Sequence, residues 1–180
     1  NVTGPIPTEI AVSMMIEIAN GIDYAHNTPI GLSGKSGVLH LDFKPSNVLI
    51  SKQGDIKVID YGIAKPTHTE RVEKIMGTLY YMAPEQVDLS KELDIRTDIY
   101  QLGTVLHEMV TGDKPYSSKL SNPEIIENIK SVPLERVMDK YPHADERVQD
   151  IIDKATKKEP DDRYQTCSEF IESLEEFKYL

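Results

Sequence analysis

Apolar residues recur every fourth position near the start of the chain. Ile10, Met14, Ile18 and Ile22 predict one apolar stripe along a helix over residues 8–26, because residues four apart lie on the same helix face. Such a helix buries one face and leaves the other in water. We therefore expect the first element to be an amphipathic helix packed against a core.

Several later segments predict further helices. Residues 98–110, with the sequence DIYQLGTVLHEMV, are apolar on nearly every side and predict a buried central helix. Asn122, followed by proline and glutamate, is typical of a helix start. An amphipathic pattern over 145–158 and a capping box at 166–169, opening a helix to about Phe177, predict two more. We expect a mainly α lobe of about six helices around the central one.

Short apolar runs predict a small β element. Residues 47–50 and 56–59 are bounded by polar residues, and a turn at 53–55 joins them as a hairpin. Another short strand is predicted at 38–39. The stretch 27–37 contains several glycine and serine residues and predicts a surface loop.

Charge and cysteine content limit the classes of partner. The formal net charge is −10, so phosphate surfaces would repel the chain, which argues against nucleic acid and anionic membranes. The chain has a single cysteine, Cys167, which excludes an internal disulfide, and we expect a reducing, cytoplasmic environment. No apolar run reaches the ~18 residues that a transmembrane helix needs.

Three motifs carry the candidate chemistry. Residues 40–47 read HLDFKPSN, with a carboxylate at Asp42 and an amide at Asn47. A carboxylate can orient a substrate hydroxyl and accept its proton, and an amide oxygen can bind Mg²⁺ beside phosphates. Residues 60–62 (DYG) add a second oxygen ligand, and residues 77–85 read GTLYYMAPE.

In this order, the motifs resemble the catalytic loop, the D-F-G motif and the end of the activation segment of serine/threonine protein kinases. The catalytic loop would be 40–47 and the activation segment 60–85. Asp98 and Arg163 resemble two further family residues, one that anchors the catalytic loop and one that pairs with Glu85. The resemblance implies the C-terminal lobe of the α+β protein kinase fold.

The resemblance also implies roles for individual residues, with ATP and Mg²⁺ as cofactors. Asp42 would be the catalytic base, and Lys44 would contact the transferring phosphate. Asn47 and Asp60 would bind Mg²⁺ and, with Lys44 and Leu49, contact ATP. It further implies a substrate pocket of Thr78, Leu79 and Met82, and structural roles for His40, Tyr61, Glu85, Asp98 and Arg163.

One substitution in the catalytic loop bears on regulation. Leu41 stands where the family usually has an arginine, which receives the phosphate of a phosphorylated activation loop. Thr67 and Thr69 are candidate phosphorylation sites. Without that arginine, we expect their phosphorylation not to switch the loop on by the usual arginine–phosphate pairing.

The sequence leaves substrate choice open. Glu108 resembles a family position that can contact a basic residue ahead of the target, but a surface glutamate at a helix end explains it equally well. Ser46 stands where family members that prefer basic substrates often carry an acid.

The family's G-x-G-x-x-G loop and strand lysine are not found in the sequence. We therefore expect residues 1–180 to be the C-terminal lobe alone, inactive until an N-terminal lobe joins it in cis or in trans. One reading is the catalytic lobe of a kinase that transfers the ATP γ-phosphate to serine or threonine of a protein substrate. The alternatives are a non-catalytic interaction module or decoy, and a phosphotransferase acting on a small molecule.

Overall fold

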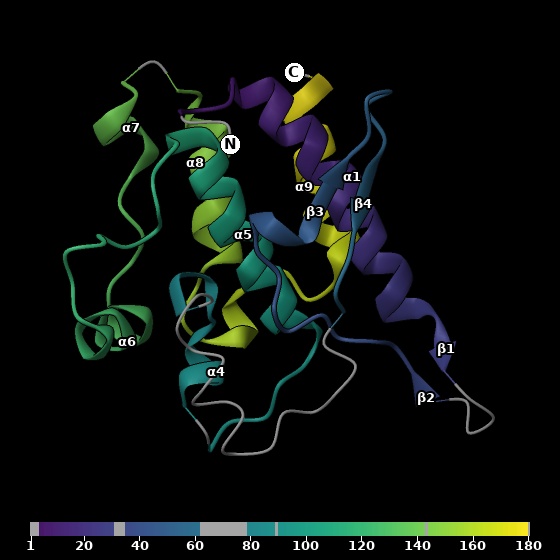
Figure 1. The fold of residues 1–180 in the computed structure, drawn as a ribbon, viewed down its shortest axis with the longest axis horizontal. Helices are drawn as coiled ribbons and strands as arrows, with labels where there is room; N and C mark the ends of the chain where they lie inside the picture. Colours follow the sequence, from purple (N-terminus) through teal and green to yellow (C-terminus); the bar gives the residue numbers. More distant parts are fainter. Residues whose placement is uncertain (1–3, 31–34, 62–78, 89, 143, 180) are drawn as a thin grey trace.

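The structure is a computed structural model that describes residues 4–30, 35–61, 79–88, 90–142 and 144–179. Helix α5 (Ile95–Thr111) runs through the middle of the molecule, and α1 (Thr8–Asn27) packs against both α5 and α9 (Cys167–Tyr179) (Figure 1). The other α-helices of the described residues are α4 (Pro84–Val87), α6 (Asn122–Ser131), α7 (Val137–Lys140) and α8 (Glu146–Ala155). The prediction of a mainly helical fold is therefore confirmed.

The central helix begins three residues earlier than the sequence pattern predicts. Asp94 caps α5 because its side chain accepts a hydrogen bond from the Arg96 backbone N–H at 2.8 Å. Gly112 ends the helix with φ 72°, a left-handed conformation that favours glycine. A Cβ at this position would also lie 2.7 Å from the backbone of Gly4 and Pro5. Both ends of α5 are thus fixed by local chemistry outside the apolar run.

The boundaries of two other helices also differ from the predictions. Ser121 rather than Asn122 caps α6, because the Glu124 carboxylate accepts bonds from both the N–H and the hydroxyl of Ser121. Helix α8 ends at Ala155 instead of residue 158. Beyond that point the carbonyl oxygens of Lys157 and Lys158 accept hydrogen bonds from the Arg163 guanidinium.

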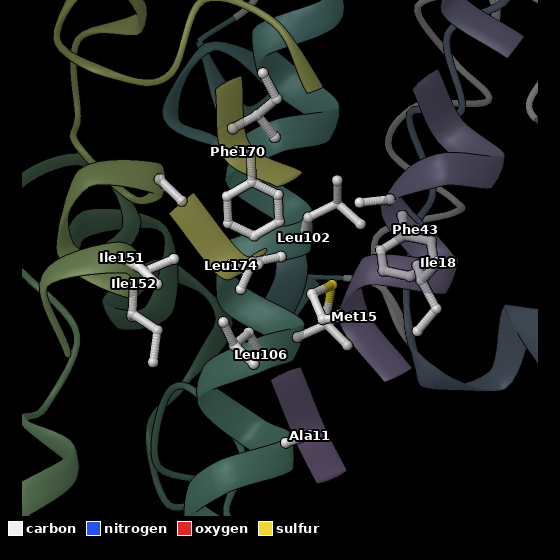
Figure 2. Close-up of a cluster of buried hydrophobic side chains, with 14 of the residues drawn as sticks. Ala11, Met15, Ile18, Phe43, Leu102, Leu106, Ile151, Ile152, Phe170 and Leu174 are labelled. Atoms are coloured by element: carbon white, nitrogen blue, oxygen red, sulfur yellow. The ribbon is translucent and has the colours of Figure 1, made fainter. Parts of the chain in front are cut away.

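The stripe predicted on α1 is partly wrong. Ile10 is 53% exposed, whereas Ala11, Met15, Ile18 and Ile22 are buried. A spacing of three and four residues, rather than four throughout, keeps a helix face in line with the core, because one turn takes 3.6 residues. Figure 2 shows Ala11, Met15 and Ile18 of α1 in one cluster with side chains of α5, α8 and α9. The labelled members from the other elements are Phe43, Leu102, Leu106, Ile151, Ile152, Phe170 and Leu174.

Two antiparallel strand pairs complete the described fold. Strand β3 (Val48–Ile50) pairs with β4 (Ile56–Val58) in the predicted hairpin, with Leu49 opposite Lys57. The stretch predicted to be a loop holds a second ladder, β1 (Pro29–Ile30) with β2 (Lys35–Ser36). The predicted strand at 38–39 does not form, because the Val38 N–H bonds the Ala25 carbonyl at the end of α1 (2.9 Å).

None of the helices in the described ranges combines the length and the apolar character that crossing a bilayer requires.

Candidate active site

Asp98, in the first turn of α5, holds the backbone of the catalytic loop. Its buried carboxylate accepts hydrogen bonds from the N–H groups of His40 (2.8 Å) and Leu41 (2.7 Å). Nε2 of His26 lies 2.7 Å from the same carboxylate. The other nitrogen of that ring lies 3.6 Å from the Cys167 sulfur, and burial raises the pKa of this thiol. These contacts connect α1, α5 and α9 to the loop that carries Asp42.

The His40 ring joins the catalytic loop to the D-Y-G segment. Its Nε2 lies 3.0 Å from the Ile59 carbonyl oxygen. The ring also packs against Phe43 and Tyr61, with centroids 5.6 and 4.8 Å away. The Tyr61 hydroxyl donates to the Gly21 carbonyl at 3.0 Å, and burial raises the pKa of this hydroxyl. The D-Y-G segment is therefore held against both the loop and α1.

Asp42, Lys44 and Asn47 form one compact group. Nζ of Lys44 donates to Oδ2 of Asp42 at 2.9 Å, and the two side chains keep 22% and 21% of their area exposed. The buried Asn47 side chain donates through Nδ2 to the Asp42 carbonyl oxygen at 2.9 Å. This leaves its Oδ1 in contact, among the described residues, with only the Ser46 hydroxyl at 3.5 Å. The carboxylate, the amine and the amide oxygen thus lie close together in one short stretch of the loop.

Asp60 follows directly beside this group. The Ile59 N–H donates to the Asn47 carbonyl at 2.9 Å, so the next residue lies close to Asn47. Asp60 is exposed and has φ 60°, which is strained for a residue other than glycine. An amide oxygen and a carboxylate are hard ligands that suit Mg²⁺. Among the described residues no three His, Cys, Asp or Glu side chains are arranged as a metal site.

A buried ion pair joins the A-P-E segment to the end of the chain. The Arg163 guanidinium donates to both oxygens of Glu85, at 2.6 and 2.8 Å, and both side chains are almost fully buried. Thr97 adds a hydroxyl bond to Glu85 at 2.9 Å. This pair joins α4, α5 and the turn at residues 160–162, and because it is buried it stabilises the fold rather than contacting a substrate.

The residues expected to contact ATP and substrate differ from one another in how exposed their side chains are. Leu49 is 53% exposed on β3, and Met82 is partly buried. A place in a substrate pocket was expected for Leu79. Its side chain is instead only 3% exposed and belongs to the core, because its turn packs on α5 and α6. The expected roles of Thr67, Thr69 and Thr78 concern positions outside the described residues.

Glu108 is already paired within the chain. Its carboxylate accepts the Tyr81 hydroxyl at 2.6 Å and the Lys114 ammonium at 2.9 Å. Lys114 also contacts the Tyr81 hydroxyl. Burial and the bond to Glu108 raise the pKa of this hydroxyl, so it stays protonated. A basic substrate residue would therefore have to compete with Lys114 for the carboxylate.

Two amides that were not predicted from the sequence, the partly buried Gln86 and the buried Gln101, contact the backbone on both sides of Asp42. A signal was present, because Gln101 is a polar residue inside the predicted buried helix 98–110. A buried amide needs hydrogen-bond partners, and its position in the centre of the fold restricts where those partners lie.

A carboxylate, an amine and two oxygen ligands beside a buried loop anchor are the groups expected of a phosphoryl-transfer site. Comparison with known proteins identifies the family. Residues 2–174 match the protein kinase domain family. The chain therefore belongs to the protein kinase family.

Individual relatives agree with this result. A probable serine/threonine-protein kinase of Clostridium perfringens is 37% identical over 180 residues, which covers 97% of this chain and 24% of the relative. The tyrosine-protein kinase MasK of Myxococcus xanthus is 33% identical over 175 residues (96% and 27%). The serine/threonine-protein kinase PknB of Mycolicibacterium smegmatis is 30% identical over 174 residues (92% and 26%). The chain thus spans about a quarter of the length of the curated relatives it matches.

Proposed function

We propose that this chain is the C-terminal catalytic lobe of a serine/threonine protein kinase, which transfers the γ-phosphate of ATP to a protein hydroxyl. The observation that carries the proposal is the group of Asp42, Lys44 and Asn47, with Asp60 following beside it. A non-catalytic protein would gain nothing from keeping these four polar groups around one partly open site.

Each residue has a task that its surroundings support. Asp42 would accept a hydrogen bond from the substrate hydroxyl and take its proton, since its carboxylate is open to solvent on one side. Lys44, now 2.9 Å from that carboxylate, would hold a phosphate oxygen close to the same hydroxyl. Catalysis of this type depends on positioning and charge rather than on a covalent intermediate.

ATP and Mg²⁺ are the cofactors implied by the family, and the donor set fits them. Asn47 would offer Oδ1 and Asp60 its exposed carboxylate to Mg²⁺, which when bound neutralises phosphate charge. Leu49, exposed on β3, would contact the adenine ring. Because the reaction consumes ATP, we propose a cytoplasmic location for the chain.

A second lobe would cover this site. The sequence lacks the Gly-rich loop and strand lysine that grip ATP in the family. Leu49 and Ile50 leave 53% and 56% of their surface exposed on β3, as expected of an apolar surface that a partner covers. We propose that an N-terminal kinase lobe, in cis or in trans, supplies those groups and that the chain alone transfers phosphate poorly.

The test is phosphoryl transfer by the natural protein that contains this chain, with serine, threonine and tyrosine peptides offered in parallel. Asp42→Asn should lower kcat by ~10²-fold or more, the range of a lost acid–base group. Asp55→Asn is the control, because Asp55 is an exposed aspartate in the β3–β4 turn. Transfer to tyrosine alone would refute the serine/threonine assignment.

Nucleotide binding separates the catalytic reading from the alternative. Titration of the same protein with Mg·ATP, beside Asp60→Asn, should give Mg²⁺-dependent binding that the substitution weakens. A protein that neither binds Mg·ATP nor transfers phosphate would be the non-catalytic interaction module.

A further inference from the structure

The peptide backbone on both sides of Asp42 is held by side chains from other elements. Asp98 accepts the N–H of Leu41 at 2.7 Å, and Asn47 donates to the carbonyl of Asp42 at 2.9 Å. The Asp42 N–H lies 3.4 Å from Nδ1 of His40, and this stretch also contains the carbonyl of Leu41 and the N–H of Phe43. These last two groups lie immediately before and after Asp42, so they determine how the peptide units that carry its side chain are oriented.

Gln101 reaches both of these groups from the centre of α5. Its side chain is fully buried. Oε1 accepts the Phe43 N–H at 3.0 Å, and Nε2 lies 3.4 Å from the Leu41 carbonyl oxygen. The same Nε2 donates to Oε1 of Gln86 at 3.0 Å. One amide thus bonds the backbone on each side of Asp42 and a second amide as well.

Gln86 completes the arrangement from α4. Its Nε2 donates to the Leu41 carbonyl at 2.7 Å, a shorter bond than the one from Gln101. Its Oε1 accepts the backbone N–H of Ala83, at 3.0 Å, as well as the Gln101 amide. Ala83 belongs to the A-P-E segment, so the two glutamines link the end of the activation segment to the catalytic loop.

We propose that Gln86 and Gln101 are positioning residues that fix the 41–43 backbone and thereby aim the Asp42 carboxylate, an inference that rests on the proposed kinase function. The pair is uncharged, and each amide both donates and accepts a hydrogen bond. The support it gives therefore needs no phosphate on the activation segment. This matches the presence of Leu41, which has no charge to pair with such a phosphate.

Backbone strain gives these bonds a purpose. Leu41 has φ 60°, a conformation that a residue with a Cβ adopts only when its surroundings impose it. The Leu41 N–H is held by Asp98 and its carbonyl by the two glutamines. Without the glutamines, the Leu41 carbonyl loses the hydrogen bonds that they donate, so the peptide between Leu41 and Asp42 is less restrained and the carboxylate can shift with it.

The experiment compares two matched substitutions in the natural protein that contains this chain. Gln101→Met keeps the length of the side chain and removes every hydrogen bond. Gln149→Met is the control, because Gln149 is equally buried and its Oε1 accepts the Val137 N–H at 2.7 Å, away from the catalytic loop. Gln86→Met is a milder second variant, since Gln86 is only partly buried.

Gln101→Met should lower kcat by about ten-fold or more, because small misplacements of a catalytic group cost up to ~10²-fold. KM for ATP should stay within about two-fold. Gln86→Met should act in the same direction, and the double variant should cost less than the product of the two. Gln149→Met should lose similar thermal stability and leave kcat within about two-fold.

Amide hydrogen exchange provides a second readout that does not depend on activity. The Phe43 amide should exchange faster in Gln101→Met, and the Val137 amide in Gln149→Met. Equal kcat losses in Gln101→Met and Gln149→Met, or unchanged protection of Phe43, would overturn the proposal. If the unsubstituted protein transfers no phosphate, the proposed function fails, and the exchange rates alone decide whether the glutamines hold this backbone.

Discussion

Replacing Arg163 by methionine should destabilise the fold more than replacing one partner of an exposed ion pair. The guanidinium has five N–H donors, and all five are used. Two bond the Glu85 carboxylate, at 2.6 and 2.8 Å. The others bond the carbonyl oxygens of Lys157 (2.7 Å), Arg96 (2.9 Å) and Lys158 (3.0 Å). The side chain is fully buried, so water cannot replace these partners.

The magnitude follows from what Arg163→Met leaves behind. The Glu85 carboxylate stays buried with the Thr97 hydroxyl, at 2.9 Å, as its remaining donor among the described residues. Removing one partner of a buried ion pair costs ~3–5 kcal/mol of unfolding free energy. For a domain of this size the melting temperature falls by ~2–4 °C per kcal/mol, so we expect a decrease of ~6–20 °C. Thermal and denaturant unfolding followed by circular dichroism measure both quantities.

Two comparisons decide whether the buried charge is the cause. Arg136 lies 3.6 Å from Glu146 with 57% of its side chain exposed, so Arg136→Met should cost within ~1 kcal/mol. A double variant, Glu85→Leu with Arg163→Met, removes both charges and should be more stable than Arg163→Met alone. The unpaired charge of Glu85 is not the cause if Arg163→Met costs no more unfolding free energy than Arg136→Met, or if removing the second charge lowers the stability further.

Two further predictions concern stability. Burial, with the charge of Arg163 adding to it, lowers the pKa of Lys158 to about 8. Above that pH the unfolded state binds more protons at this residue than the folded state does. The free energy of unfolding of the unsubstituted protein, relative to that of Lys158→Met, should therefore rise from pH 8 to ~10. Unfolding of both proteins across this range measures the difference, and a gap that stays constant or narrows contradicts it. A Cβ on Gly103 would lie 2.6 Å from the Cβ of Ala155, so Gly103→Ala should cost ~1–3 kcal/mol through overpacking between α5 and α8. Adding Ala155→Gly should recover part of that loss in melting temperature; no recovery would show that the contact is not the cause.

The long helices could be predicted from sequence because their patterns are local. The apolar run at 98–110 identifies α5, and the hairpin of β3 and β4 follows from two short runs and a turn. The short helices α4 and α7, of four residues each, could not be predicted. A helix of one turn has no stable isolated form, so these elements exist because neighbouring parts of the chain hold them.

The same distinction applies to the site. Asp42, Lys44 and Asn47 lie within one continuous motif, so their sequence spacing nearly determines their arrangement. Gln86 and Gln101 come from separate elements, and only tertiary structure brings both amides to the Leu41 carbonyl. Contiguous motifs therefore predicted the groups that would touch a substrate, and the family resemblance predicted Asp98 as an anchor of the loop, but neither predicted the two glutamines.

The two strained residues show why that support has to come from several elements. Leu41 and Asp60 both have φ 60°, and each such conformation costs ~1–3 kcal/mol and persists only where its surroundings impose it. At Leu41, the N–H donates to Asp98 and the carbonyl accepts from the two glutamines, so the peptide groups on both sides are held. At Asp60, the preceding Ile59 is held through its N–H by the Asn47 carbonyl and through its own carbonyl by His40. Because Asn47 in turn bonds the Asp42 carbonyl, the two strained points belong to one connected network. A change at either point should therefore alter the orientation of the Asp42 carboxylate as well as that of Asp60.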